Sequence, residues 1–114
     1  YDIEVAGYDS FRCAVTDLTA AVPSTAVTEL ALKHRAEIGR CEGVFISCTQ
    51  LLTMDEIDTL EKQLGCPVVT SNQATLWAGL TFLGISTQTV AAGRLCRLPA
   101  GAKVKAVTRA AVAG

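Results

Sequence analysis

Apolar and polar positions along the chain recur with two different periods, and these periods predict strands and helices in alternation. Residues 2–6 alternate polar and apolar side chains, which predicts a short strand that ends at Gly7. Residues 24–38 carry apolar side chains at helical spacing, so we expect a helix with one buried face. Residues 43–47 form a continuous apolar run with β-branched members, which is typical of a strand covered on both faces.

The next segment predicts a helix over residues 54–64 with clear signals at both ends. Thr53 precedes it, and Glu56 stands three residues later, as in a capping box. Gly65 follows the last apolar position and is a typical C-terminal signal.

A further strand and helix follow at the same spacing. Residues 67–70 predict a buried strand, and the helix after it continues to Gly84, with Ser71 a suitable N-cap. Alternation of strands and helices in this order predicts parallel strands joined by right-handed crossovers. The expected fold class is therefore α/β, a parallel sheet flanked by helices.

The pattern weakens after Gly84. Residues 94–98 could form a short edge strand, and residues 103–113 a basic, alanine-rich helix. All eleven acidic residues lie in the first 61 positions, which sum to −7, whereas the remaining 53 sum to +6. We treat residues 99–114 as a basic tail of unknown role, for which contact with an acidic partner is one option.

Composition narrows the class of protein. The chain has 114 residues, half of them hydrophobic and 18% charged, which fits one small packed domain. A net charge of −1 argues against nucleic acid as a partner. We expect no membrane contact, because the chain contains no apolar stretch of roughly 18 residues, and its first residues do not resemble a secretion signal. His34 is the single histidine, so a histidine-rich metal site is excluded.

The cysteines suggest a reducing compartment. They stand at positions 13, 41, 48, 66 and 96, an odd number without a C-x-x-C pair, which suits neither a zinc site nor a disulfide framework. We therefore expect a cytoplasmic protein. Cys13, Cys41, Cys66 and Cys96 are interpreted as small buried hydrophobic residues, and Cys48 is considered separately because of its position.

The candidate functional residues lie at two strand-to-helix junctions. The carboxyl ends of parallel strands and the N-termini of the following helices lie along one edge of the sheet, and this edge favours anions. Both junctions are rich in small hydroxyl and amide side chains, which suit a carboxylate ligand. A thiol beside them could act as a nucleophile or in proton transfer. The polar residues are Ser47, Thr49 and Gln50 at the first junction, with Cys48 between them, and Thr70, Ser71, Asn72 and Gln73 at the second.

A structural interpretation of the same residues stays open. Ser71 could simply cap a helix, Thr49 could close a turn, and Trp77 at helical spacing is a typical core residue. Cys48 could pack as other cysteines at strand ends do.

Two runs closely resemble one enzyme family. Residues 44–51 read Val-Phe-Ile-Ser-Cys-Thr-Gln-Leu, and residues 67–77 read Pro-Val-Val-Thr-Ser-Asn-Gln-Ala-Thr-Leu-Trp. Together they resemble the second half of the maleate isomerase and arylmalonate decarboxylase branch of the aspartate/glutamate racemase superfamily. The likeness covers residues 1–98, includes Gly93-Arg94-Leu95, and stops before the tail.

The resemblance implies a site shared by two similar flavodoxin-like α/β domains, with a cofactor-free cleft and typically one cysteine from each side. By resemblance Cys48 is the second-domain cysteine, which serves in proton transfer on small maleate-like or malonate-like acids. Ser47 and Thr49 are implied contacts of the substrate carboxylate, and Ser71 and Asn72 line the neighbouring strand end. No cofactor is implied.

The resemblance also leaves parts of the family pattern unmatched. Family members open the second domain with a strand carrying a Thr-Pro-Tyr-like element and a helix, and Tyr1 would follow both. We therefore expect residues 1–98 to be a partial second domain, truncated at its N-terminus and incomplete without a first domain. Two hypotheses remain: an isomerase, racemase or decarboxylase-type enzyme, or a non-catalytic binding module that associates with copies of itself.

Overall fold

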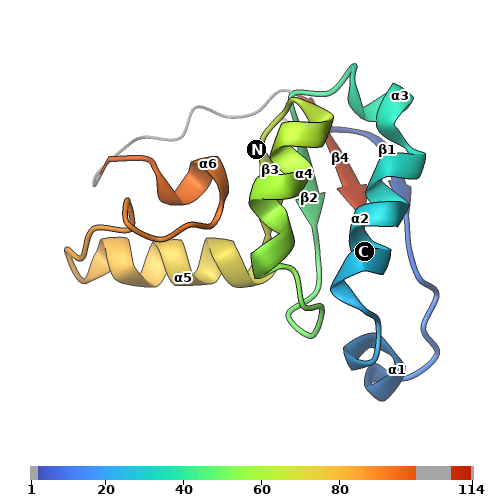
Figure 1. Cartoon of the computed structure of the whole chain (residues 1–114), viewed down its shortest axis with the longest axis horizontal. Helices are drawn as coiled ribbons and strands as arrows, with labels where there is room; N and C mark the ends of the chain where they lie inside the picture. The colour runs from blue at the N-terminus through green and yellow to red at the C-terminus, as the bar shows by residue number, and fades with distance from the viewer. Residues whose placement is uncertain (1–2, 100–108, 114) are drawn as a thin grey trace.

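Four parallel strands form one sheet in the computed structural model, which describes residues 3–99 and 109–113 (Figure 1). Their order is β1-β4-β2-β3, and every neighbouring pair is parallel. This arrangement confirms the α/β class with a parallel sheet. The strands are β1 Glu4–Asp9, β2 Gly43–Ile46, β3 Val68–Thr70 and β4 Arg109–Ala113.

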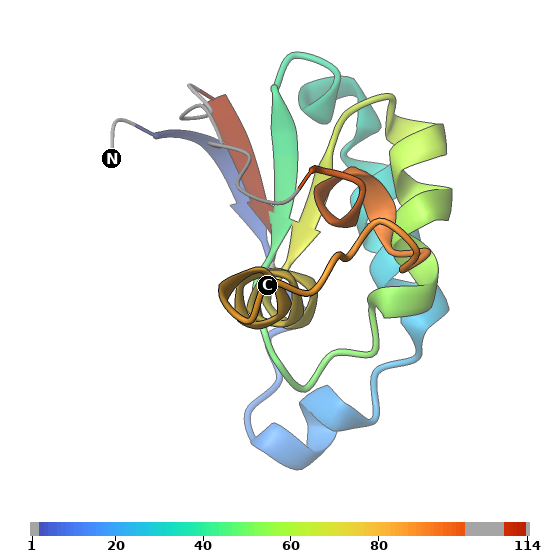
Figure 2. The ribbon, with the colours of Figure 1, turned by 90° about the vertical axis from the view of Figure 1, so that its left-hand side faces the viewer.

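Helices connect these strands, and α2, α3 and α4 lie together on one side of the sheet (Figure 2). The longest helix, α5, extends away from the carboxyl end of β3 (Figure 1). Among the described residues, no helix has the length and apolar character needed to cross a membrane. The helical elements are α1 Thr16–Ala20, α2 Ser24–Lys33, α3 Arg35–Ile38, the 3-10 turn η1 Met54–Glu56, α4 Ile57–Leu64, α5 Ser71–Phe82 and α6 Gly93–Cys96.

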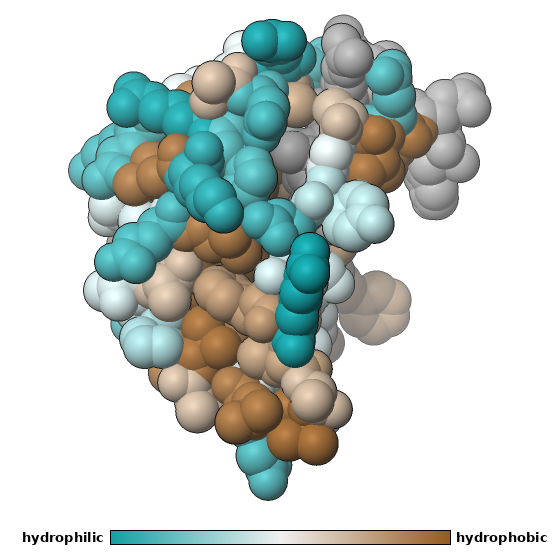
Figure 3. Space-filling view, turned by 90° about the vertical axis from the view of Figure 1, so that its right-hand side faces the viewer, coloured by the Kyte–Doolittle hydropathy of each residue, from teal (hydrophilic) through white to brown (hydrophobic). Residues whose placement is uncertain are grey.

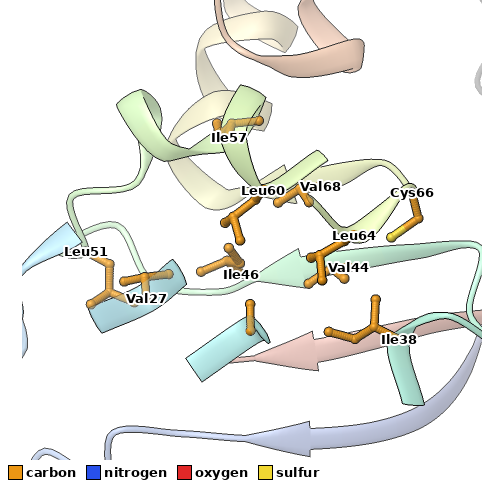
Figure 4. Close-up of a cluster of buried hydrophobic side chains, with 11 residues drawn as sticks. Val27, Ile38, Val44, Ile46, Leu51, Ile57, Leu60, Leu64, Cys66 and Val68 are labelled. Carbon is orange, nitrogen blue, oxygen red and sulfur yellow. The ribbon is translucent and has the colours of Figure 1, made fainter. Parts of the chain in front are cut away.

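The hydrophobic core lies between β2, β3 and the helices α2 and α4 (Figure 4). Ile46 and Val68 reach it from adjacent strands, and Ile57 and Leu60 reach it from α4. Burying one such side chain stabilises the fold by about 2 kcal/mol. This core fixes β2 and β3 against α4, and thereby fixes the carboxyl ends of the two strands.

The expectation that residues 43–47 are covered on both faces is wrong for one face. Val44 and Ile46 are buried against the helices, whereas Phe45 is only half-buried. Phe45 pairs in register with Val69 of β3, which is also half-buried. The α2–α4 layer covers a single face, so within residues 3–99 these two side chains have no equivalent layer.

The first strand begins later than predicted and continues through Gly7 to Asp9. Its register with β4 shifts between Val5 and Tyr8, an irregularity that the alternation of residues 2–6 does not reveal. Residues 1–2 lie outside the described part of the chain.

The helix predicted over residues 24–38 is divided at His34. Its φ of −97° and ψ of 15° leave the helical region, so α2 ends at Lys33 and α3 starts at Arg35. The imidazole bonds to Asp9 and to Glu37 through its two nitrogens. These tertiary contacts accompany an interruption that helical spacing alone does not predict.

The capping box expected at Thr53 and Glu56 is absent. Thr53 makes no side-chain cap bond, and its buried Oγ1 lacks a partner within the described part of the chain. The Glu56 carboxylate instead accepts hydrogen bonds from the hydroxyls of Ser24, at 3.0 Å, and Thr28, at 2.9 Å. Those contacts tie η1 to α2, whereas the C-terminal signal is confirmed, because Gly65 adopts a left-handed φ of 77°.

The edge strand expected at residues 94–98 is wrong, because residues Gly93–Cys96 form α6. The backbone N–H of Arg94 donates to the Glu61 carboxylate, which holds this segment against α4. Gly93 has a φ of 72°, and a Cβ there would collide with the Ile57 side chain. Close packing against α4 therefore determines the conformation of α6.

The basic helix expected over residues 103–113 is wrong over Arg109–Ala113, which form β4, and residues 103–108 lie outside the described residues. β4 lies between β1 and β2 and pairs with both. Backbone partners on two sides outweigh the helical propensity of alanine, because tertiary context overrides so weak a preference.

Candidate active site

The two strand-to-helix junctions lie side by side at the carboxyl edge of the sheet. Ile46 at the end of β2 pairs in register with Thr70 at the end of β3. The backbone N–H of Cys48 donates to Ser71 Oγ at 3.2 Å, and Asn72 Nδ2 donates to the Thr49 carbonyl at 3.0 Å. The structure therefore brings together four of the five residues singled out from the sequence.

Ser47 is the fifth residue of this set. It is the exposed position between the end of β2 and Cys48. Chain continuity places it beside the thiol-bearing residue.

Cys48 has an unusual backbone conformation. Its φ is 142°, a region that residues with a side chain rarely adopt. The side chain is half-buried and packs against the edge of the core. Strained backbone of this kind costs about 1–3 kcal/mol and is found most often at functional sites.

Thr70 and Gln73 stabilise the fold, and their side chains are not available to bind a ligand. Thr70, not Ser71, is the N-cap of α5, and it forms a capping box with Gln73. Both side chains are fully buried, and Gln73 Nε2 also donates to the Ala92 carbonyl at 2.6 Å. The spacing Thr-x-x-Gln is a capping-box signal that the sequence carries.

The N-terminal turn of α5 is thereby held at the end of β3. Its first-turn N–H groups and the helix dipole favour negative charge at this position. Ser71 and Asn72 occupy that turn and face the Cys48 junction through their hydrogen bonds. The edge therefore combines a thiol, hydroxyl groups, an amide and a helix N-terminus, which suit a small anionic ligand.

Glu61, which the sequence analysis did not single out, fixes β3 and α6 to α4 through its carboxylate. Its side chain is only 5% exposed. It accepts hydrogen bonds from the backbone N–H groups of Val68, at 3.1 Å, and Arg94, at 3.1 and 2.9 Å. Its place among the apolar positions of α4 could have indicated a buried acid.

The remaining cysteines fall into two groups. Cys66 and Cys96 are buried as predicted, and burial raises the pKa of each thiol. Cys13 and Cys41 are only partly buried, so the same prediction is wrong for them. Over the part of the chain that the structure describes, no cluster of three potential ligands could hold a metal ion.

Comparison with known proteins identifies close relatives. The sequence pattern of the arylmalonate decarboxylase family matches residues 1–96. A curated arylmalonate decarboxylase from Bordetella bronchiseptica is 32% identical over 78 residues, which are 68% of this chain and 32% of that relative.

Solved structures agree with this result. A glycine-to-cysteine mutant of arylmalonate decarboxylase in the sulfate ion associated form has a TM-score of 0.70 at 28% identity, covering 82% of this chain and 40% of that chain. Unliganded arylmalonate decarboxylase has a TM-score of 0.69 at 28% identity, covering 81% and 40%. The chain therefore spans less than half the length of the relatives that it matches.

Proposed function

Because the chain belongs to the arylmalonate decarboxylase family, we propose that it is the Cys48-bearing part of a cofactor-independent enzyme for small carboxylic acids. The proposed reaction is decarboxylation or racemase-type and isomerase-type proton transfer on malonate-like or maleate-like acids. The observation that carries this proposal is the half-buried Cys48, which has a positive φ and donates a backbone hydrogen bond to Ser71. The proposed cellular location is the cytoplasm.

Cys48 acts in this proposal as the proton donor. Loss of carbon dioxide from a malonate-type acid breaks one carbon–carbon bond and leaves its electron pair on the α-carbon as an enediolate. The Cys48 thiol transfers its proton to that carbon, and the thiolate recovers a proton from water. In racemase-type turnover, the same sulfur exchanges a proton with the α-carbon.

The neighbouring polar groups hold the remaining carboxylate. Ser71 Oγ accepts from the Cys48 N–H, so its own hydroxyl hydrogen is left to donate. Asn72 donates one of its two side-chain N–H groups to the Thr49 carbonyl, so the other N–H group can donate to a ligand. The hydroxyls of Ser47 and Thr49 add two further donors next to the thiol, and the α5 N-terminus favours the negative charge.

A first domain completes the site in this proposal. The chain spans 32% of the curated relative, and the family resemblance implies carboxylate contacts from both sides of a cleft. We expect turnover to be strongest when the N-terminal half of that relative is supplied as a separate chain.

The test is deuterium incorporation at the α-carbon, with product formation, for phenylmalonate and maleate in D2O. It compares the wild-type chain with Cys48→Ser, and with Cys13→Ser as the matched control at another half-buried cysteine. We expect Cys48→Ser to abolish incorporation and Cys13→Ser to leave it unchanged. Absence of Cys48-dependent incorporation, both alone and with the added N-terminal half, would refute the enzymatic proposal.

A second candidate function is self-association as a non-catalytic binding module. Phe82 is 90% exposed and Tyr8 85% exposed, and Phe45 and Val69 are only half-buried. Exposed apolar surface favours association. Sedimentation at low micromolar concentration is expected to show dimers or larger species that Phe82→Ser weakens, whereas a clean wild-type monomer would contradict this candidate.

A further inference from the structure

A third strand ends at the edge of the sheet that carries the Cys48 junction. Asp9 at the end of β1 and Ile46 at the end of β2 both pair in register with Ala113 of β4. The ends of β1 and β2 are therefore level, and they lie two strand spacings apart, or about 10 Å. The segment that follows β1 thus leaves the sheet at the same edge as the segment that carries Cys48.

Arg12 lies in the segment after β1 and shares an unusual backbone conformation with Cys48. Its φ is 52°, and among the described residues Arg12 and Cys48 are the non-glycine residues with a positive φ. Such residues are uncommon and are found most often at functional sites. Phe11, directly before Arg12, packs against the same core cluster as Cys48. The core therefore anchors both segments, and each has a strained residue directly after a strand.

Arg12 supplies the positive charge at this edge. It is exposed, and it is the only lysine or arginine in the segments that directly follow β1, β2 and β3, which are residues 10–15, 47–53 and 71–77. Val15 and Leu18 come soon after it and are more than half exposed. Figure 3 shows brown apolar side chains at the lower end of this side of the molecule. Apolar neighbours strengthen an ion pair, because they lower the local dielectric constant.

No acid among the described residues neutralises Arg12, since none of their ion pairs includes it. The Asp9 carboxylate accepts hydrogen bonds from the Ser10 N–H and the His34 imidazole, and Lys33 attracts it as well. The guanidinium of Arg12 therefore keeps its N–H donors for a ligand. A planar guanidinium binds a carboxylate through two parallel hydrogen bonds.

We propose that Arg12 binds a second carboxylate of the substrate and thereby determines specificity for four-carbon dicarboxylic acids, an inference that rests on the proposed function. The first carboxylate binds at Ser71 and Asn72, the reacting carbon lies at Cys48, and the second carboxylate extends towards Arg12. This sequence of contacts follows the order of the strands from β3 through β2 to β1. The two carboxylates of a malonate share one carbon, whereas those of a four-carbon acid lie further apart and span this edge better.

A cation at the second carboxylate also favours one class of reaction. Decarboxylation converts a carboxylate into neutral carbon dioxide, so a cation bound to the leaving group stabilises the starting acid more than the transition state. Proton exchange between the Cys48 sulfur and the α-carbon changes neither carboxylate, and the Arg12 contact persists throughout. Arg12 therefore favours racemase-type or isomerase-type turnover of maleate-like acids over decarboxylation.

The test titrates the full chain with succinate, a four-carbon dicarboxylate without a reactive double bond, and follows backbone amide shifts by NMR. Butyrate, the monocarboxylate of the same length, is the comparator. We expect saturable shifts at Arg12, Cys48 and Ser71, with succinate bound at least about tenfold more tightly than butyrate. Equal affinities for the two acids, or no shift at millimolar succinate, would overturn the proposal.

Variants assign the preference to Arg12. Arg12→Gln is expected to lower the affinity for succinate to that for butyrate. Arg12→Gly removes the same charge without steric cost at a φ of 52°, so it keeps the test decisive if Arg12→Gln does not fold. Arg40→Gln, at an exposed arginine that precedes β2 and so lies at the opposite edge, is the control with unchanged affinity. A wild-type preference for succinate in Arg12→Gln would contradict the assignment.

Succinate binding is measured without turnover, so this inference and the proposed function can fail separately. Arg12-dependent binding of succinate without Cys48-dependent deuterium incorporation would refute the enzymatic function and support the dicarboxylate site. Cys48-dependent incorporation together with equal affinities for succinate and butyrate would refute the role of Arg12 alone.

Discussion

The backbone N–H of Cys48 donates a hydrogen bond to Ser71 Oγ across 3.2 Å, although 23 residues separate the two positions. This bond joins the end of β2 to the first residue of α5. Cys48, which has a φ of 142°, thereby lies beside the helix N-terminus. The position of the cysteine therefore depends on the neighbouring junction as well as on its own strand.

Replacing Ser71 by alanine removes the acceptor of this bond. We expect faster hydrogen exchange at the Cys48 amide and a loss of about 1 kcal/mol in the free energy of unfolding. Hydrogen exchange followed by NMR and urea denaturation measure the two effects. Ser47→Ala, at an exposed serine, is the control, and unchanged protection of the Cys48 amide in Ser71→Ala would show that the bond contributes nothing.

Strain at Cys48 predicts an unusual order of stability between two substitutions. Both Cys48→Gly and Cys48→Ala remove the thiol, but only glycine adopts a φ of 142° without steric cost. We expect the glycine variant to be more stable than the alanine variant by about 1 kcal/mol in urea denaturation. In an ordinary strand the order would be reversed, so greater stability of the alanine variant would argue against strain.

The buried Glu61 carboxylate is expected to be important for the stability of the fold. Glu61→Ala leaves the N–H groups of Val68 and Arg94 without their acceptor, and should lower the free energy of unfolding by about 3 kcal/mol. The matched control is Asp58→Ala, which removes a more exposed partner of Arg97 and should cost less than about 1 kcal/mol. Similar losses for the two variants in thermal or urea unfolding would refute the distinction.

The His34 contacts predict a pH dependence of stability. Hydrogen bonds to Asp9 and then Glu37 raise the pKa of His34, and the bond to His34 lowers the pKa of Asp9. The His34 contribution is complete below the usual histidine pKa of about 6.5 and is lost as the pH rises through the raised value. The Asp9 contribution is complete above about pH 4 and is lost as the pH falls through the lowered value.

Urea denaturation across this pH range measures the effect. Stability is expected to be highest between about pH 4 and 6.5 and to decline above that range. His34→Gln should remove the part of the alkaline decline that belongs to the imidazole, while Glu29→Gln should retain it. An identical pH profile for wild type and His34→Gln would contradict the contribution assigned to His34.

The sequence best predicted the strands and helices whose positions depend on the local pattern of apolar residues. Apolar runs located β2 and β3, helical spacing located α2, α4 and α5, and Gly65 marked a helix end correctly. Parallel pairing followed from the order of these elements, and it placed the Cys48 and Ser71 junctions at one edge.

Contacts between distant segments were not predictable in the same way. His34 divides a helix while contacting Asp9, 25 residues earlier, and Arg94 lies in α6 with its N–H bound to Glu61, 33 residues away. The insertion of β4 between β1 and β2 depends on backbone pairing with both strands. These features depend on contacts between segments that are distant in the sequence. The periodicity of hydrophobic residues carries no information about such contacts.

The proposed mechanism requires Cys48 as the source of the proton delivered to the α-carbon. The most direct measurement is the rate at which phenylmalonate in D2O is converted to α-deuterated phenylacetate, with the N-terminal half of the Bordetella bronchiseptica relative supplied. Wild type and Cys13→Ser are expected to form this product faster than the uncatalysed reaction, and Cys48→Ser and Cys48→Gly only at the uncatalysed rate. A rate for Cys48→Ser equal to that of wild type would contradict the role of Cys48 as proton donor.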